Sequence, residues 1–217
     1  MENKKRLLII SAGDFGREVL GWAFDIAKEQ KTWEIAGFLD DRPEILDSYN
    51  CPVGIIGDPN SYQPQNDDLF VCAIGDTATK LKYCDELQSR GARFTTLIHP
   101  TVVVGPGCNI GKGCILCPNT TITTNVTIGD HAILNLSSTV GHDVVIGDGC
   151  TMSNQTDVNG HARLGKGVFI GSHASILPGI EVGEFATVGA GSIVTQKVDP
   201  HTTVFGVPAR RLPKFDK

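Results

Sequence analysis

The sequence lacks both a long hydrophobic run and an excess of basic charge. No apolar run approaches the roughly 20 residues that a transmembrane helix needs. A net charge of −5 argues against nucleic acid as a partner and leaves no basic patch for a membrane surface. The apolar stretch near the start is too short for a signal peptide, because Asp14 and Arg17 interrupt it. We therefore expect a cytoplasmic protein that binds neither nucleic acid nor membrane.

A paired cysteine motif of the kind that binds zinc is also missing. Cys114 and Cys117 form a C-x-x-C, but no second pair follows among the seven cysteines. Cys114 is instead explained by its place in a repeat, where a small residue recurs. We therefore expect no metal cofactor.

What the sequence does contain is a six-residue repeat that runs from 98 to 194. Neither an α-helix nor a simple alternating strand has this period, which is typical of a hexapeptide β-helix. A small residue recurs four positions after most of the apolar ones, and glycine often follows the apolar residue and accepts the dihedral angles of the turn. The repeat predicts a left-handed parallel β-helix with three sides per coil, one hexapeptide to each side. The apolar positions are Ile98, Val104, Ile110, Leu116, Ile122, Ile128, Leu134, Val140, Ile146, Met152, Val158, Leu164, Ile170, Ile176, Val182, Val188 and Val194.

The part before the repeat alternates between strand and helix patterns. This alternation predicts a small parallel sheet of the Rossmann-like, nucleotide-binding type. We therefore divide the chain into a Rossmann-like domain, 1–94, and a β-helix domain with a C-terminal tail, 95–217. Strands are expected at 5–10, 33–39 and 68–74, helices at 17–30 and 77–90, a loop at 50–67, and a tail at 204–210 that leaves the coils.

Ligands of such sheets bind beyond the carboxyl ends of the strands. A full G-x-G-x-x-G is absent because Ser11 occupies the first position, so a dinucleotide cofactor is not expected. The short glycine turn can also be read as a tight turn without a ligand. The residues expected to border one crevice are Gly13, Asp14, Phe15, Asp40, Asp41 and Gly75.

His142 is the histidine best placed for chemistry. It lies in a predicted turn, and Asp143 follows it directly. Gly160 stands three hexapeptides further on, one coil above, and a glycine there would expose its backbone N–H beside the imidazole. A general base and an oxyanion donor in adjacent coils are what acyl transfer requires. The alternative is that His142 is an ordinary exposed turn residue.

Several motifs along nearly the whole chain resemble one family of enzymes. The chain is similar to bacterial nucleotide-sugar acetyltransferases of the bacillosamine and perosamine type and to sialic acid O-acetyltransferases. The motifs are the turn at 13–16, Phe38-Leu39-Asp40-Asp41, Ala73-Ile74-Gly75, Leu97-Ile98-His99-Pro100, His142-Asp143, Ile176-Leu177-Pro178-Gly179 and Gly206-Val207-Pro208-Ala209-Arg210.

This resemblance implies acetyl-CoA as donor and the amino group of a nucleotide-linked deoxysugar as acceptor. It implies that His142 is the general base, that Asp143 orients it, and that the Gly160 amide binds the thioester carbonyl. Positions that match the family's coenzyme contacts are Thr151, Ser172 and Ala190, and the crevice residues match its nucleotide contacts. The resemblance further implies a homotrimer with each active site between two subunits.

Three other functions stay open from the sequence. The acceptor could be a hydroxyl group, as in sialic acid O-acetylation, or the chain could be a sugar-nucleotide-binding scaffold without catalysis. A zinc hydratase of the β-helical carbonic anhydrase type would need three histidines, for which His142 and His161 together with His131 or His173 are the candidates. Thr151 departs from the resemblance, because a histidine is common in that coil of the family.

Overall fold

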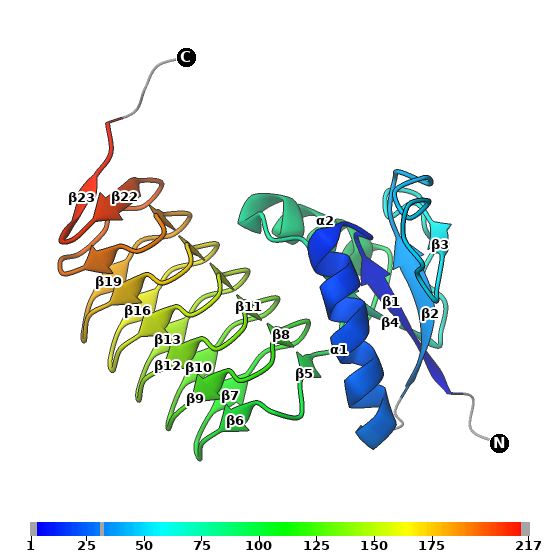
Figure 1. The fold of residues 1–217 in the computed structure, drawn as a ribbon, viewed down its shortest axis with the longest axis horizontal. Coiled ribbons are helices and arrows are strands. Elements are labelled where there is room, and N and C mark those ends of the chain that lie inside the picture. Colours follow the sequence, from blue (N-terminus) through cyan, green and yellow to red (C-terminus); the bar gives the residue numbers. More distant parts are fainter. Residues whose placement is uncertain (1–3, 31–32, 214–217) are drawn as a thin grey trace.

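The computed structural model describes residues 4–30 and 33–213, which form an N-terminal α/β domain and a stack of coils (Figure 1). The N-terminal sheet is parallel, with the strand order β3-β2-β1-β4. No helix in the described part of the chain is long and apolar enough to cross a membrane. The elements are β1 (Lys5–Ile10), α1 (Asp14–Gln30), β2 (Trp33–Leu39), β3 (Ile55–Gly57), β4 (Asp68–Cys72) and α2 (Thr77–Ser89).

Strand β1 is buried on both faces, which explains its unbroken apolar sequence. Leu7 and Ile9 pack into one core together with apolar residues of α1. Leu8 and Ile10 pack into a second core that includes Leu87 of α2. The two helices therefore cover opposite faces of the sheet, as the predicted Rossmann-like arrangement requires.

The N-terminal elements differ from the sequence prediction most clearly in two places, while β4 ends at Cys72 rather than at residue 74 and α2 at Ser89 rather than at residue 90. Helix α1 begins at Asp14 rather than at residue 17, because Gly16 lets the chain turn tightly: a Cβ there would lie 2.0 Å from the Ser11 carbonyl oxygen. The segment 50–67, expected to be loop, contains β3. Strand β3 pairs with β2 beside Gly37, where a Cβ would lie 2.6 Å from the Gly54 carbonyl oxygen. The prediction missed both features because each depends on a close approach of two backbone segments.

The coils form three flat parallel sheets, which confirms the predicted β-helix. Residues three hexapeptides apart pair directly, for example Thr139 with Asp157. Coil sheet 1 contains β5 (Leu97–Ile98), β8 (Ile115–Leu116), β11 (Ile133–Leu134), β14 (Thr151–Met152), β17 (Phe169–Ile170), β20 (Thr187–Val188), β22 (Thr203–Gly206) and β23 (Ala209–Arg211). Coil sheet 2 contains β6 (Val103–Val104), β9 (Thr121–Ile122), β12 (Thr139–Val140), β15 (Asp157–Val158), β18 (Ser175–Ile176) and β21 (Ile193–Val194). Coil sheet 3 contains β7 (Asn109–Ile110), β10 (Thr127–Ile128), β13 (Val145–Ile146), β16 (Arg163–Leu164) and β19 (Glu181–Val182).

The apolar residue of each repeat fills the interior of the coils. From Leu116 to Val194, all of these side chains are at most 3% exposed. In the first coil the burial is weaker, and Val104 is 41% exposed, because no earlier coil covers it. The repeat therefore predicted the core correctly except at its open end.

The C-terminal tail does not leave the coils where the repeat ends. Strand β22 pairs in parallel with β20, with Thr203 opposite Thr187, and so adds one more rung to coil sheet 1. Strand β23 then folds back on β22 as an antiparallel hairpin. The prediction was wrong here because these two strands continue the pairing after the six-residue pattern has stopped.

The N-terminal domain packs on coil sheet 1. Ile115 and Ile133, which point outward from the coils, belong to the same apolar core as α1 and β1. From α2, the buried Lys80 ammonium donates hydrogen bonds to the Cys150 carbonyl oxygen (3.1 Å) and to the Thr151 hydroxyl (2.8 Å). Figure 1 shows α2 lying beside the coils. The domain thereby covers coil sheet 1 at β8, β11 and β14, whereas His142 and His161, in the turns between coil sheets 2 and 3, are exposed.

Candidate active site

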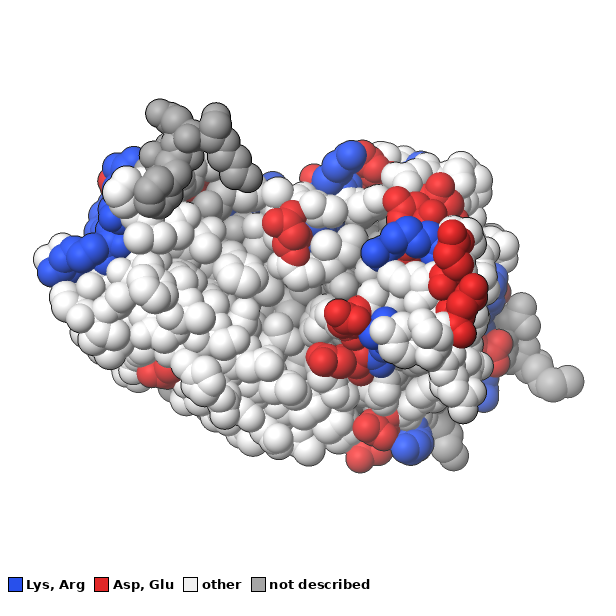
Figure 2. Space-filling view, turned by 45° about the horizontal axis from the view of Figure 1, so that its top comes forward, with Lys and Arg blue, Asp and Glu red and all other residues white. Residues whose placement is uncertain are grey.

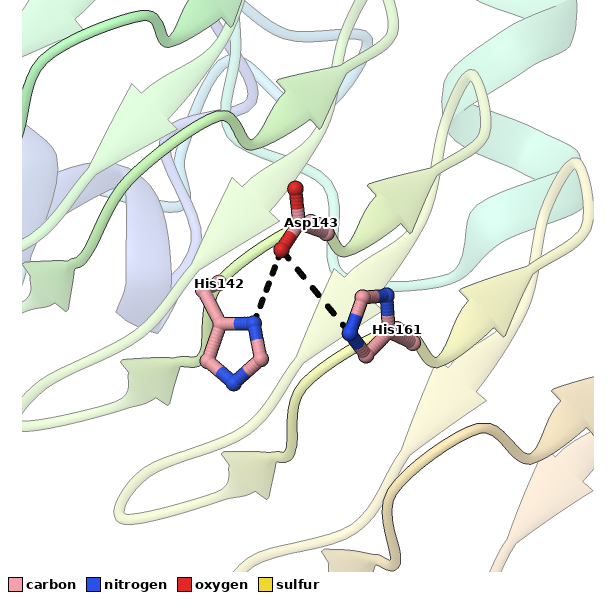
Figure 3. Close-up of side chains that lie close together, drawn as sticks. All are labelled: His142, Asp143 and His161. Carbon is pink, nitrogen blue, oxygen red and sulfur yellow. Dashed lines mark hydrogen bonds and ion pairs between the residues drawn. The ribbon is translucent and has the colours of Figure 1, made fainter.

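His142, Asp143 and His161 lie together at the corner where coil sheet 2 turns into coil sheet 3 (Figure 3). We call this group, with Gly160, the open corner. His142 Nδ1 lies 2.8 Å from Asp143 Oδ2, and His161 Nε2 lies 3.9 Å from the same oxygen. The two imidazole rings meet edge to face, with centroids 4.9 Å apart. The expected pair of His142 and Asp143 is thus in place, with a second histidine beside it.

The repeat itself brings these residues together. Asp143 and His161 occupy the same turn position in adjacent coils, and both have left-handed backbone angles, with φ of 60° and 62°. The His161 amide donates to the His142 carbonyl oxygen at 2.9 Å, which locks the two turns one above the other. The stacked turns project their side chains from one edge of the prism into solvent.

The electrostatics favour a base at Nε2 of His142. A neutral imidazole has one donor and one acceptor nitrogen. Since Asp143 can only accept at Nδ1, that nitrogen carries the proton, and the lone pair is on Nε2. The hydrogen bond from His142 holds the pKa of Asp143 below its usual value, so the carboxylate stays ionised. The His142 side chain is 56% exposed and can be reached by a substrate.

Gly160 faces the ring of His142. A Cβ at Gly160 would lie 2.6 Å from His142 Nε2, so this close approach requires glycine. Within the described ranges, no hydrogen bond uses the Gly160 amide N–H. The open corner thus combines an imidazole acceptor, a carboxylate and a vacant N–H donor.

His161 was not predicted as a site residue. A signal was available, since residue 161 stands three hexapeptides after Asp143, which is one full coil. One donor atom each from His142, Asp143 and His161 lies within 4.8 Å of the other two, and no other such group of three occurs in the described part of the chain. These side chains are therefore also the ones able to hold a metal ion.

The residues expected to contact a coenzyme are divided between two places. Ser172 and Ala190 stack at a different corner, where coil sheet 1 turns into coil sheet 2, and Phe205 packs against Gly189 beside them. Thr151 is buried, at 2% exposure, and its hydroxyl accepts the hydrogen bond from Lys80. The N-terminal domain covers Thr151, so the structure does not support the expected coenzyme contact for that residue.

A crevice of about 230 Å³ lies at the carboxyl ends of β1 and β2, beside α2. Asp41 lines it as expected, and Ser11, Arg42, Thr79 and Tyr83 line it as well. The last four were not predicted, because α2 and the loop after β2 approach the strand ends only in the folded domain. Gly13 borders this region, since a Cβ there would lie 4.0 Å from the Arg42 guanidinium.

The other predicted crevice residues have less direct positions. Asp40 is buried and accepts hydrogen bonds from the Ala12 amide (2.8 Å) and from Arg42. Burial acts to raise the pKa of Asp40, but these hydrogen bonds outweigh it and hold the pKa below its usual value. Asp40 therefore shapes the crevice rather than standing free in it.

Asp14, Phe15 and Gly75 lie outside the lining of this cavity. Asp14 pairs with Arg17 at 2.6 Å, and Phe15 packs edge-on against Trp22 in α1. Gly75 is exposed and follows Ile74, which does line the cavity. The crevice therefore brings together fewer of the predicted residues than the strand-end argument suggested.

Comparisons with known proteins define the class of this chain. Residues 6–87 match the PglD N-terminal domain, and residues 161–196 match the bacterial transferase hexapeptide repeats. The chain therefore joins a PglD-type N-terminal domain to a hexapeptide-repeat β-helix.

Individual relatives place it more closely. The GDP-perosamine N-acetyltransferase of Escherichia coli O157:H7 is 30% identical over 144 residues, which are 62% of this chain and 61% of that protein. The acetyltransferase domain of PglB from Neisseria gonorrhoeae superimposes with a TM-score of 0.87 at 27% identity, over 96% of this chain and 100% of that one. PerB of Caulobacter crescentus, solved in complex with CoA and GDP-perosamine, gives 0.86 at 26% identity, over 95% and 97%. The chain is thus homologous to sugar N-acetyltransferases, which confirms the resemblance predicted from its motifs.

Proposed function

We propose that this protein transfers an acetyl group from acetyl-CoA to the amino group of a nucleotide-linked amino-deoxysugar, in the synthesis of a surface glycan. The observation that carries the proposal is the pairing of His142 with Asp143 beside the vacant Gly160 N–H. A base next to a carboxylate and an oxyanion donor is the arrangement that acyl transfer needs. The homology to sugar N-acetyltransferases supports the choice of donor and acceptor.

In the proposed reaction the amine nitrogen attacks the thioester carbonyl carbon. His142 Nε2 accepts the proton that the amine loses, and Asp143 stabilises the resulting imidazolium through Nδ1. The Gly160 N–H donates to the oxyanion of the tetrahedral intermediate. Collapse of the intermediate breaks the carbon–sulfur bond, and the CoA thiolate leaves and takes up the proton from His142, which returns to its neutral form. The products are the N-acetylated sugar and CoA.

In this proposal the two domains have different roles. Residues 1–94 bind the nucleotide, with Asp41 and Gly13 at the crevice, Asp40 shaping it, and Asp14, Phe15 and Gly75 near its edge. Residues 95–217 hold the coenzyme and perform the chemistry. Ser172 and Ala190 contact the coenzyme at one corner, and its thioester reaches Gly160 at the next corner.

We further propose that each active site lies between two subunits of a homotrimer. The N-terminal domain packs on coil sheet 1, whereas His142 lies where the other two sheets meet. A second chain can bring its crevice to this corner. The coils also offer flat surfaces with few charges on the face shown in Figure 2, while charged side chains gather over the N-terminal domain. Exposed apolar residues such as Val103 and Phe205 are available for such contacts.

The test is a thiol-release assay with acetyl-CoA and a panel of nucleotide-linked sugars. We expect CoA release only with sugars that carry a free amino group, and one N-acetylated product per CoA. The matching sugars with a hydroxyl in place of the amine serve as controls. Turnover with the hydroxyl sugars alone would replace N-acetylation by O-acetylation, and no turnover with any sugar would contradict the proposal.

A further inference from the structure

We propose that the open corner also binds a divalent transition-metal ion of the zinc class, as an inhibitor and not as a cofactor. Two imidazoles and one carboxylate form a donor set that zinc accepts in proteins. His142, Asp143 and His161 supply this set, with one donor atom each within 4.8 Å of the other two. No other trio of possible ligands in the described ranges meets this condition.

The ligand atoms of His142, Asp143 and His161 lie nearly close enough together to bind one ion. Ligand atoms bound to one tetrahedral zinc ion lie about 3.3 Å apart, given bonds of about 2.0–2.1 Å. Asp143 Oδ2 lies 2.8 Å from His142 Nδ1 and 3.9 Å from His161 Nε2, so these two separations are within about 0.6 Å of that value. The ligand atoms of the two histidines lie within 4.8 Å of each other, so the rings must move closer together around an ion. The side chains of His161 and Asp143 are 65% and 41% exposed, and they have room for this adjustment.

Binding at Nδ1 of His142 would remove the base. A neutral imidazole has one protonated nitrogen and one lone pair, so a metal on Nδ1 moves the proton to Nε2. Nε2 then donates instead of accepting and cannot take a proton from the substrate amine. Asp143 is occupied by the ion at the same time. The ion therefore competes with the base function itself, and this consequence rests on the proposed function, whereas the binding does not.

Metal binding can be tested without any substrate. Titration of the full-length protein with Zn²⁺ in a calorimeter should show one ion per open corner, and Mg²⁺, which prefers oxygen ligands, should not bind there. His161→Asn should weaken Zn²⁺ binding by at least about tenfold. Loss of a group that only hydrogen-bonds to a metal ligand already costs about 10- to 100-fold in metal affinity, and His161 is a ligand itself. The matched control is His201→Asn, because His201 is an exposed turn residue at another corner with a similar left-handed backbone, φ of 55°. Equal Zn²⁺ affinity in the wild type and His161→Asn would overturn the site.

Inhibition is measured separately in the thiol-release assay, with each variant compared with its own rate without metal. We expect Zn²⁺ to inhibit the wild type and His201→Asn equally, and His161→Asn to need at least about tenfold more Zn²⁺ for the same inhibition. Binding at the open corner without inhibition would overturn the claim that the ion captures the base. Failure of every sugar in the assay would contradict the proposed function but leave the calorimetric result standing.

Discussion

His131 and His161 occupy the same position of the six-residue repeat but have opposite surroundings. Both are turn residues with left-handed angles, φ of 58° and 62°. His131 is 3% exposed and lies edge-on to Phe94, with ring centroids 4.7 Å apart. Burial lowers its pKa. The side chain of His161 is 65% exposed and belongs to the polar group at the open corner.

The difference comes from the N-terminal domain and not from the repeat. Leu81 of α2 packs over Gly149, and Lys80 bonds to the neighbouring Thr151, so this side of the prism is closed. In the part of the chain that the structure describes, the corner between coil sheets 2 and 3 has no such cover, and His142 and His161 are exposed there. The repeat thus sets the backbone of every turn equally, and the docked domain decides which turns can meet a substrate.

The largest effect is expected from removing the proposed base at the open corner. His142→Ala should lower turnover by at least about a hundredfold, the usual contribution of a general base. The affinity for CoA, measured by calorimetry, should barely change, because the proposed coenzyme contacts, Ser172 and Ala190, lie at a different corner from His142. His201→Asn, at an exposed turn of another corner, is the control and should keep its turnover. A loss below tenfold in His142→Ala would show that another group accepts the proton.

Crowding the ring of His142 should have the next largest effect. In Gly160→Ala the new Cβ would lie 2.6 Å from Nε2, so the ring must rotate away from its position. We expect at least about a tenfold loss of turnover, since a misplaced catalytic group loses much of its effect. Gly21→Ala in α1 is the control, because nothing lies within 4 Å of a Cβ there. Unchanged turnover in Gly160→Ala would show that the reaction does not depend on the observed position of the His142 ring.

A smaller effect is expected from neutralising Asp143. Asp143→Asn keeps the shape of the side chain but cannot stabilise a protonated His142 as a carboxylate does. Turnover should fall by about tenfold, less than in His142→Ala, while the KM for acetyl-CoA stays the same. Steady-state kinetics measures both quantities. A loss of turnover as large as that of His142→Ala would show that catalysis depends on the Asp143 carboxylate as strongly as on the base.

Lys80 of α2, which is buried against the coils, is expected to make the free energy of unfolding depend on pH. Burial lowers the pKa of Lys80 to about 8 from its ordinary 10.5, so the unfolded chain binds more protons between these values. The contribution of Lys80 to the free energy of unfolding therefore rises with pH from 8 to 10.5, by about 3 kcal/mol at most. Denaturant unfolding of the wild type and Lys80→Met at several pH values measures the difference. Their curves should diverge in this window, and parallel curves would contradict the buried charge.

Much of this fold could be predicted from local sequence alone. The apolar core from Leu116 to Val194 and the register of three hexapeptides per coil follow from the repeat, because each coil contacts mainly its neighbours. The pair of His142 and Asp143 is adjacent in sequence and equally visible. Contacts between distant segments could not be predicted from the sequence. They include the burial of Thr151 by Lys80 and the pairing of β22 with β20. Such contacts depend on how two finished elements dock, which no local pattern records.

The proposed sharing of each active site between two subunits is tested most directly by mixing two variants that are each expected to be inactive. Gly13→Trp should block the crevice without a clash of its Cβ, and His142→Ala removes the base. If each site takes its crevice from one subunit and its base from the next, co-expressed chains that assort at random restore about a quarter of the sites. The purified mixture is therefore expected to regain about a quarter of the wild-type thiol release. Activity no higher than that of the two variants alone would show that no site is shared between chains.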